Sequence, residues 1–119
     1  MSDAVRIGAI AEARRWYWQR VSAMVLALCV VIHLATIIYA GHAGLTAEAI
    51  LARTRGSVVV AAFYGLFVLA CAVHVPIGVA NIAREWWGLG ARASLMLSRV
   101  FALLLVVLGA RAIAAVVLP

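Results

Sequence analysis

Three long apolar stretches alternate with short polar segments along this chain. The apolar stretches cover approximately residues 18–40, 57–83 and 94–118. A helix needs about 20 apolar residues to cross a hydrocarbon core of about 30 Å, and each stretch is at least that long. We therefore predict one all-α integral membrane domain over residues 1–119, with three transmembrane helices.

The segments outside these stretches predict how the three helices are connected. Residues 1–16 mix apolar and charged positions, which is typical of a short interfacial helix before the first span. In the first loop, Thr46 is placed to cap a short surface helix. The stretch WWGLGARAS between the second and third spans is brief and rich in glycine, so we expect those two helices to be antiparallel neighbours.

The composition excludes an ordinary soluble domain and indicates an orientation. Only 12% of the residues are charged, against roughly 25% in soluble proteins. All ten basic residues are arginine, and they concentrate in the N-terminal segment and the second loop. The positive-inside rule then places the N-terminus in the cytoplasm and the C-terminus outside, and no nucleic-acid partner is needed to explain the charge.

Small residues inside the spans predict close packing. Helices in lipid associate through small side chains and polar contacts, because lipid gives them no hydrophobic drive. Gly65, Gly78, Gly109 and many alanines offer such surfaces for partner helices. Cys29 and Cys71 also fall inside spans, where cysteine most often behaves as a small buried apolar residue.

Two histidines lie inside the apolar stretches, and they carry the candidate chemistry. His33 is in the first span and His74 in the second; ionisable residues at membrane depth are functional hypotheses by default. Three interpretations compete: an interhelical hydrogen bond, a proton relay, and ligation of haem iron by a neutral imidazole. A relay needs carboxylates at depth, whereas all four acidic residues lie outside the spans or at their ends: Asp3, Glu12, Glu48 and Glu85.

The neighbours of His74 favour haem ligation. Gly78 and Cys71 lie one turn to either side of it, so small side chains flank the imidazole on its own helical face. Pro76 cannot donate a hydrogen bond to Ala72, which predicts a bend close to the histidine.

Polar residues near the cytoplasmic ends of the spans are candidates for holding a haem propionate or a quinone carbonyl. Ser22 shares a helical face with His33, and Arg20 lies beside it at the membrane rim. Arg99 lies about one turn into the third span. For Arg20, a snorkelling membrane anchor is an equally weighted alternative.

The stretches WYWQRVSAMVLAL and AVHVPIGVANIAREWWG, followed by a third apolar span, resemble the small membrane-anchor subunits of succinate:quinone oxidoreductases, the succinate dehydrogenases and fumarate reductases. The resemblance covers nearly the whole chain in length and in its three-span layout. Its specific part is short: Arg-x-Ser in the first span, His-x-x-x-Gly in the second, and an acidic-aromatic pair at the end of the second.

The resemblance implies a haem b site. His74 would be the axial ligand of the haem iron, with Gly78 leaving space for the ring. Arg99 is a further propionate candidate. In relatives with two haems, the second is ligated from the first helix, and His33 would take that role.

The resemblance also implies a quinone site at the cytoplasmic face, for ubiquinone or menaquinone. Arg20 and Ser22 match the arginine and serine that lie near the quinone and a haem propionate in the family. Glu85 and Trp86 stand where the family typically has Asp-Tyr, whose tyrosine hydroxyl donates to the quinone. The chain departs from the family here, although a tryptophan indole still offers one N–H donor.

On this hypothesis the chain does no dehydrogenation itself. It would sit in the bacterial cytoplasmic (inner) membrane with a flavoprotein subunit, an iron–sulfur subunit and a second membrane-anchor subunit that completes a larger helical bundle. QRVSA and HVPIG fit parts of both anchor types, and the short N-terminal segment favours the smaller, hydrophobic one. The alternatives are a haem-free structural subunit, a small transporter-type subunit, and the cytochrome b anchor of a formate dehydrogenase or hydrogenase.

Overall fold

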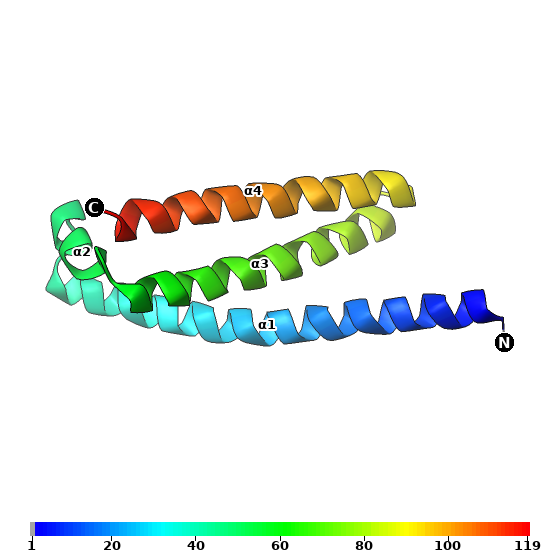
Figure 1. The fold of residues 1–119 in the computed structure, drawn as a ribbon, viewed down its shortest axis with the longest axis horizontal. Coiled ribbons are helices and arrows are strands. Elements are labelled where there is room, and N and C mark those ends of the chain that lie inside the picture. The colour runs from blue at the N-terminus through cyan, green and yellow to red at the C-terminus, as the bar shows by residue number, and fades with distance from the viewer. Residues whose placement is uncertain (1) are drawn as a thin grey trace.

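The computed structural model describes residues 2–119, which form four α-helices. These are α1 (Asp3–Ala43), α2 (Ala47–Thr54), α3 (Val58–Glu85) and α4 (Ala91–Val117). Three of them, α1, α3 and α4, are long and apolar enough to cross a membrane. They run side by side in an elongated bundle of 60 × 24 × 23 Å, with α3 between the other two (Figure 1). The prediction of an all-helical protein with three helices that could span a membrane is confirmed for residues 2–119.

The first helix is longer than the first span. With 41 residues, α1 is about 60 Å long at 1.5 Å per residue, about twice the thickness of a hydrocarbon core. Residues 3–16 therefore do not form a separate helix but continue into the span, and their N-terminal end projects beyond α3 and α4 (Figure 1). The cause is local, because this segment is rich in alanine and arginine, which favour helix, and contains no proline.

The short helix α2 forms where the sequence predicts it. The Thr46 side chain accepts a hydrogen bond from the Ala49 N–H (3.2 Å) and caps the helix. The last residue of α2 and the turn after it hold the C-terminal end of α4, since Thr54 Oγ1 donates to the Val116 carbonyl (2.6 Å) and the Gly56 N–H to the Val117 carbonyl (2.8 Å). The final carbonyls of a helix have no partner within that helix, so these two donors satisfy carbonyls that α4 itself leaves unpaired.

The helices α3 and α4 are antiparallel neighbours, as the short glycine-rich turn predicts. Gly88 adopts a positive φ of 62° in this turn, a conformation that favours glycine. Farther along the pair, a Cβ on Gly109 would lie only 2.6 Å from Val68 Cγ2. Gly109 is therefore used for close packing within the chain, whereas a Cβ on Gly65 would meet nothing within 4 Å.

The interior of the bundle consists mostly of small side chains. The buried residues are Ser22, Cys29, Ala70, Pro76, Ala80, Ala83 and Ser94. Most large apolar side chains are exposed, as expected of helices whose outer surface faces lipid. The helix α3 continues through Pro76 as one element.

Candidate functional site

His74 faces α1 and lies against Ser22. The His74 Nδ1 and Ser22 Oγ atoms are 3.4 Å apart, and the serine is only 5% exposed. Ser22 Oγ also lies 3.1 Å from the Gln19 carbonyl, to which it donates its single hydrogen. With the serine hydrogen on the Gln19 carbonyl, the serine oxygen accepts from the histidine; in that arrangement Nδ1 carries the imidazole hydrogen and Nε2 keeps its lone pair free.

Gly78 lies one turn beyond His74 and faces Gln19 on α1. A Cβ on Gly78 would lie 3.6 Å from Gln19 Nε2, an ordinary van der Waals contact, so the amide packs beside this glycine. The other amide atom, Gln19 Oε1, is buried without a hydrogen-bond partner. We call Gln19, Ser22, His74 and Gly78 the His74 cluster.

The His74 cluster fits one axial ligand of a haem iron. Histidines that bind metals usually donate their second ring N–H to another group, which fixes the tautomer, and Ser22 is placed to accept it. The Gly78 face is filled by the Gln19 side chain, which is flexible. Because Gln19 Oε1 has no hydrogen-bond partner to lose, rotating this side chain to admit a flat ring breaks no bond of that oxygen.

A site built from several protein ligands to one metal ion is not observed. Among residues 2–119, no group of three or more histidine, cysteine, aspartate or glutamate side chains is placed to hold an ion. Iron held in a porphyrin needs only one protein ligand on each axial side, so this finding leaves the haem hypothesis unaffected.

A polar contact extends the interface between α1 and α3 toward the predicted cytoplasmic end. Arg15 Nη2 donates to Asn81 Oδ1 (3.2 Å). The sequence predicts a role for Arg15 in the orientation of the chain and in the docking face of the iron–sulfur subunit, and no role for Asn81. The sequence does contain an indication that Asn81 belongs to this interface, because it lies seven residues after His74 and therefore on the same helical face.

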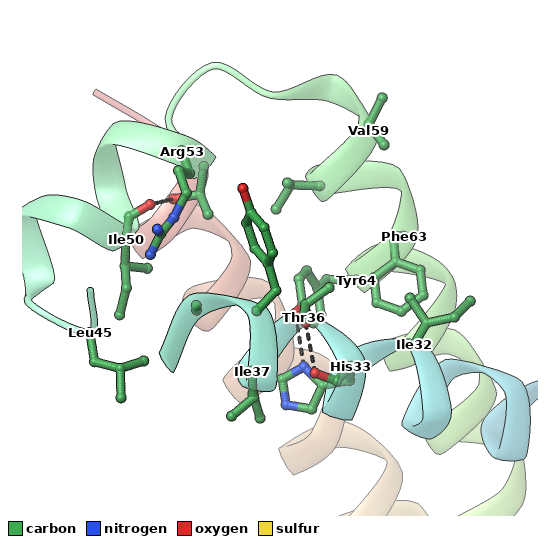
Figure 2. Close-up of a pocket in the computed structure, with 14 residues that line it drawn as sticks. Ile32, His33, Thr36, Ile37, Leu45, Ile50, Arg53, Val59, Phe63 and Tyr64 are labelled. Atoms are coloured by element: carbon green, nitrogen blue, oxygen red, sulfur yellow. Dashed lines mark hydrogen bonds between the residues drawn. The ribbon is translucent and has the colours of Figure 1, made fainter. Parts of the chain in front are cut away.

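The second histidine also pairs across α1 and α3. His33 Nδ1 lies 2.8 Å from the Tyr64 hydroxyl (Figure 2), and the imidazole packs edge-on against the rings of Tyr64 and Phe67. This is the interhelical hydrogen bond that was one of the interpretations of His33. Sequence reasoning missed Tyr64, whose only signal is a phenol inside an apolar span.

All these contacts share one register. The pairs are Arg15 with Asn81, Gln19 with Gly78, Ser22 with His74, and His33 with Tyr64. The two residue numbers of each pair add to 96 or 97, as antiparallel helices in one fixed register require. The interface between α1 and α3 therefore carries a row of contacts from Arg15 to His33.

Four other predicted site residues do not join the His74 cluster. The Arg20 guanidinium lies over the Trp16 ring, 5.1 Å from its centroid, on an exposed face of α1. Trp86 is 81% exposed, and Glu85 and Arg99 are exposed as well. Their roles toward quinone and propionate stay predictions.

Comparisons with protein-family models, with curated proteins and with solved structures found no match for this chain.

Proposed function

We propose that the chain is the membrane-anchor subunit of a succinate:quinone oxidoreductase and that His74 binds haem b. The observation that carries this proposal is the Ser22–His74 pair: with the serine hydrogen on the Gln19 carbonyl, the Nε2 lone pair is available at membrane depth. The short motifs Arg-x-Ser and His-x-x-x-Gly support the same assignment.

The proposed orientation puts the N-terminus and the turn between α3 and α4 in the cytoplasm of a bacterial cell. The arginines concentrate at that end, and Trp16, Trp18, Trp86 and Trp87 lie exposed there, as residues of an interfacial belt do. An iron–sulfur subunit would dock on this face and receive electrons from a flavoprotein subunit that oxidises succinate.

Three residues of the His74 cluster have distinct roles in the proposal. His74 would bind the haem iron, Ser22 would hold its imidazole in the required tautomer, and Gly78 would provide the face on which the ring approaches. The bound haem would supply one-electron transfer between the iron–sulfur subunit and the quinone. A second axial ligand would come from the partner anchor subunit.

The proposed quinone site lies at the cytoplasmic rim. Arg20, Glu85 and Trp86 are exposed there, so they are accessible to a ubiquinone or menaquinone that arrives from the membrane. Ser22 is buried and its hydrogen is donated to Gln19. We therefore propose that Ser22 holds the His74 imidazole and does not contact the quinone. The rim residues Arg20, Glu85 and Trp86 would contact the quinone carbonyls.

The first test is a reduced-minus-oxidised visible spectrum of the complex purified through this chain. We expect a b-type haem signal, together with flavin and iron–sulfur clusters in the same preparation. His74→Ala should abolish the signal while the chain still inserts into the membrane, and the matched variant His33→Ala should retain it. A full haem signal in His74→Ala would contradict the ligand assignment.

A haem-free structural subunit is the second candidate, and one observation favours it. In this chain Gln19 fills the face of Gly78, and Ser22 already gives His74 a hydrogen-bond partner. An intact complex without a haem signal would support this candidate. A transporter-type subunit has less support, because Asp3, Glu12, Glu48 and Glu85 are all exposed, which leaves no carboxylate inside the bundle.

A further inference from the structure

Two apolar cavities adjoin at the end of the bundle that carries α2. The first, about 520 Å³, lies between the end of α1, α2 and the start of α3 (Figure 2). The second, about 500 Å³, lies between α3, α4 and α2. His33, Ile50, Thr54 and Tyr64 line both cavities, so the two form one branched apolar space that divides at the His33–Tyr64 pair.

The second cavity has the length of one lipid leaflet. Its wall on α4 runs from Leu105 to Val116, which is about 16 Å at 1.5 Å per residue. Half of a hydrocarbon core of about 30 Å is about 15 Å. An acyl chain that enters from the α2 end therefore fits along this wall.

A basic side chain stands at the entrance of the first cavity. Arg53, on α2, lines that cavity and uses Nη2 to donate to the Gly44 carbonyl (2.8 Å). A guanidinium has five N–H donors, so others remain for an anionic group. Among residues 2–119 no acidic side chain lines either cavity, so this charge is not neutralised at the site.

The His33–Tyr64 pair has one hydrogen to spare. A neutral imidazole and a phenol carry one N–H and one O–H between them, and their mutual hydrogen bond uses only one of these. The spare donor can bond a carbonyl oxygen of a ligand in the branched space.

The depth of this donor matches the ester level of a lipid. The 28 residues of α3 span about 42 Å, close to the 40–45 Å of a bilayer with its headgroups. Tyr64 lies six residues from the start of α3, or about 9 Å, which is just beneath the headgroup layer, at the edge of the hydrocarbon core. Ester carbonyls of a phospholipid lie at this boundary.

From these observations we propose that the branched space binds one diacyl phospholipid from the leaflet on the α2 side. Its phosphate lies at Arg53, one ester carbonyl accepts from the His33–Tyr64 pair, and one acyl chain enters each cavity. The Arg53 charge matches the phosphate, the spare donor of the His33–Tyr64 pair matches an ester carbonyl, and the two apolar branches match the two acyl chains. This inference does not depend on the proposed haem or quinone functions.

The test is native mass spectrometry of the detergent-purified full chain during titration with dioleoylphosphatidylglycerol. We expect one tightly bound lipid per chain. Arg53→Gln should weaken its binding about tenfold, because a charge-assisted hydrogen bond to the phosphate is lost. Arg55→Gln is the matched control, since Arg55 is an exposed arginine at the end of the same helix and lines neither cavity; it should bind as the unaltered chain does.

A second variant tests the cavity itself. Ala112 lines the second cavity and is exposed, so Ala112→Phe fills the space without disturbing the buried interior. We expect it to lose the bound lipid while its helical content is unchanged. Three results would each overturn the proposal. One is an equal loss of lipid binding in Arg53→Gln and Arg55→Gln, and another is full lipid binding by Ala112→Phe. The third is a dimer of this chain that takes up no phospholipid.

Discussion

Ser22 Oγ and His74 Nδ1 lie 3.4 Å apart across the interface between α1 and α3. The contact joins residues 52 positions apart in the chain, and Ser22 reaches it while donating to the Gln19 carbonyl. Through it, Ser22 on the first helix offers His74 Nδ1 a hydrogen-bond partner; with the serine hydrogen on the Gln19 carbonyl, Nε2 is the free nitrogen.

Removing the Ser22 hydroxyl should weaken haem binding by the chain. In Ser22→Ala nothing on α1 accepts from His74 Nδ1, so the imidazole is no longer held in one tautomer. Loss of such an outer partner typically lowers metal affinity 10- to 100-fold. We expect a loss of that order in a haem titration of the purified chain, together with a shifted absorption spectrum.

Ser22→Thr is the control for this prediction, because threonine keeps a hydroxyl on the same carbon. It should restore most of the affinity. Haem affinity and spectrum unchanged in Ser22→Ala would show that His74 does not depend on this contact.

A methyl group on Gly109 should destabilise the α3–α4 pair. The added Cβ would lie 2.6 Å from Val68 Cγ2, so Val68 or one of the helices must move. Overpacking of this kind costs about 1–3 kcal/mol, which denaturant unfolding in detergent micelles can measure.

Gly65→Ala is the matched control, since a Cβ there meets nothing within 4 Å. It should be neutral or slightly stabilising, because alanine favours helix over glycine. The double variant Gly109→Ala with Val68→Ala should recover stability relative to Gly109→Ala alone. Equal stability of Gly109→Ala and Gly65→Ala would rule out the close packing described above.

Tyr64→Phe should loosen the contact between α1 and α3 near the α2 end. The variant keeps the ring that packs against His33 and removes only the hydroxyl that lies 2.8 Å from Nδ1. Interhelical hydrogen bonds in membranes contribute about 0.6 kcal/mol on average and at most about 1.7 kcal/mol. We expect a loss within this range in the same unfolding assay. Tyr17→Phe, at an exposed position, should cost nothing, and a cost equal to that of Tyr64→Phe would refute the prediction.

Thr54→Val should let the C-terminal end of α4 fray. Valine has the shape of threonine but cannot donate to the Val116 carbonyl, which now receives a 2.6 Å hydrogen bond. Hydrogen exchange of the backbone amides should rise over residues 114–118 and stay unchanged in the middle of α4. Thr36→Val is the comparison, because its hydroxyl bonds only within α1, to the His33 carbonyl; protection of α4 should be normal in that variant.

Several features of this protein follow from short pieces of its sequence. Apolar runs long enough for a bilayer predict α1, α3 and α4, Thr46 predicts the start of α2, and the glycine-rich turn after Trp87 predicts the antiparallel α3–α4 pair. Each signal depends on neighbouring residues alone, because hydropathy, capping and turn conformation are local properties. The N-terminal segment was the exception, since its charges indicated an interfacial helix while its helix-forming residues simply extend α1.

The partners of the two histidines were decided by tertiary packing. Hydropathy places His33 and His74 at depth, but it does not say which side of α1 faces α3. That choice depends on where small and large side chains let the two helices approach. The register that packs Gln19 beside Gly78 and brings Ser22 to His74 also brings Tyr64 to His33 and turns Arg20 outward over Trp16. A fixed register couples all these contacts, so no single stretch of the chain contains the information for any one of them.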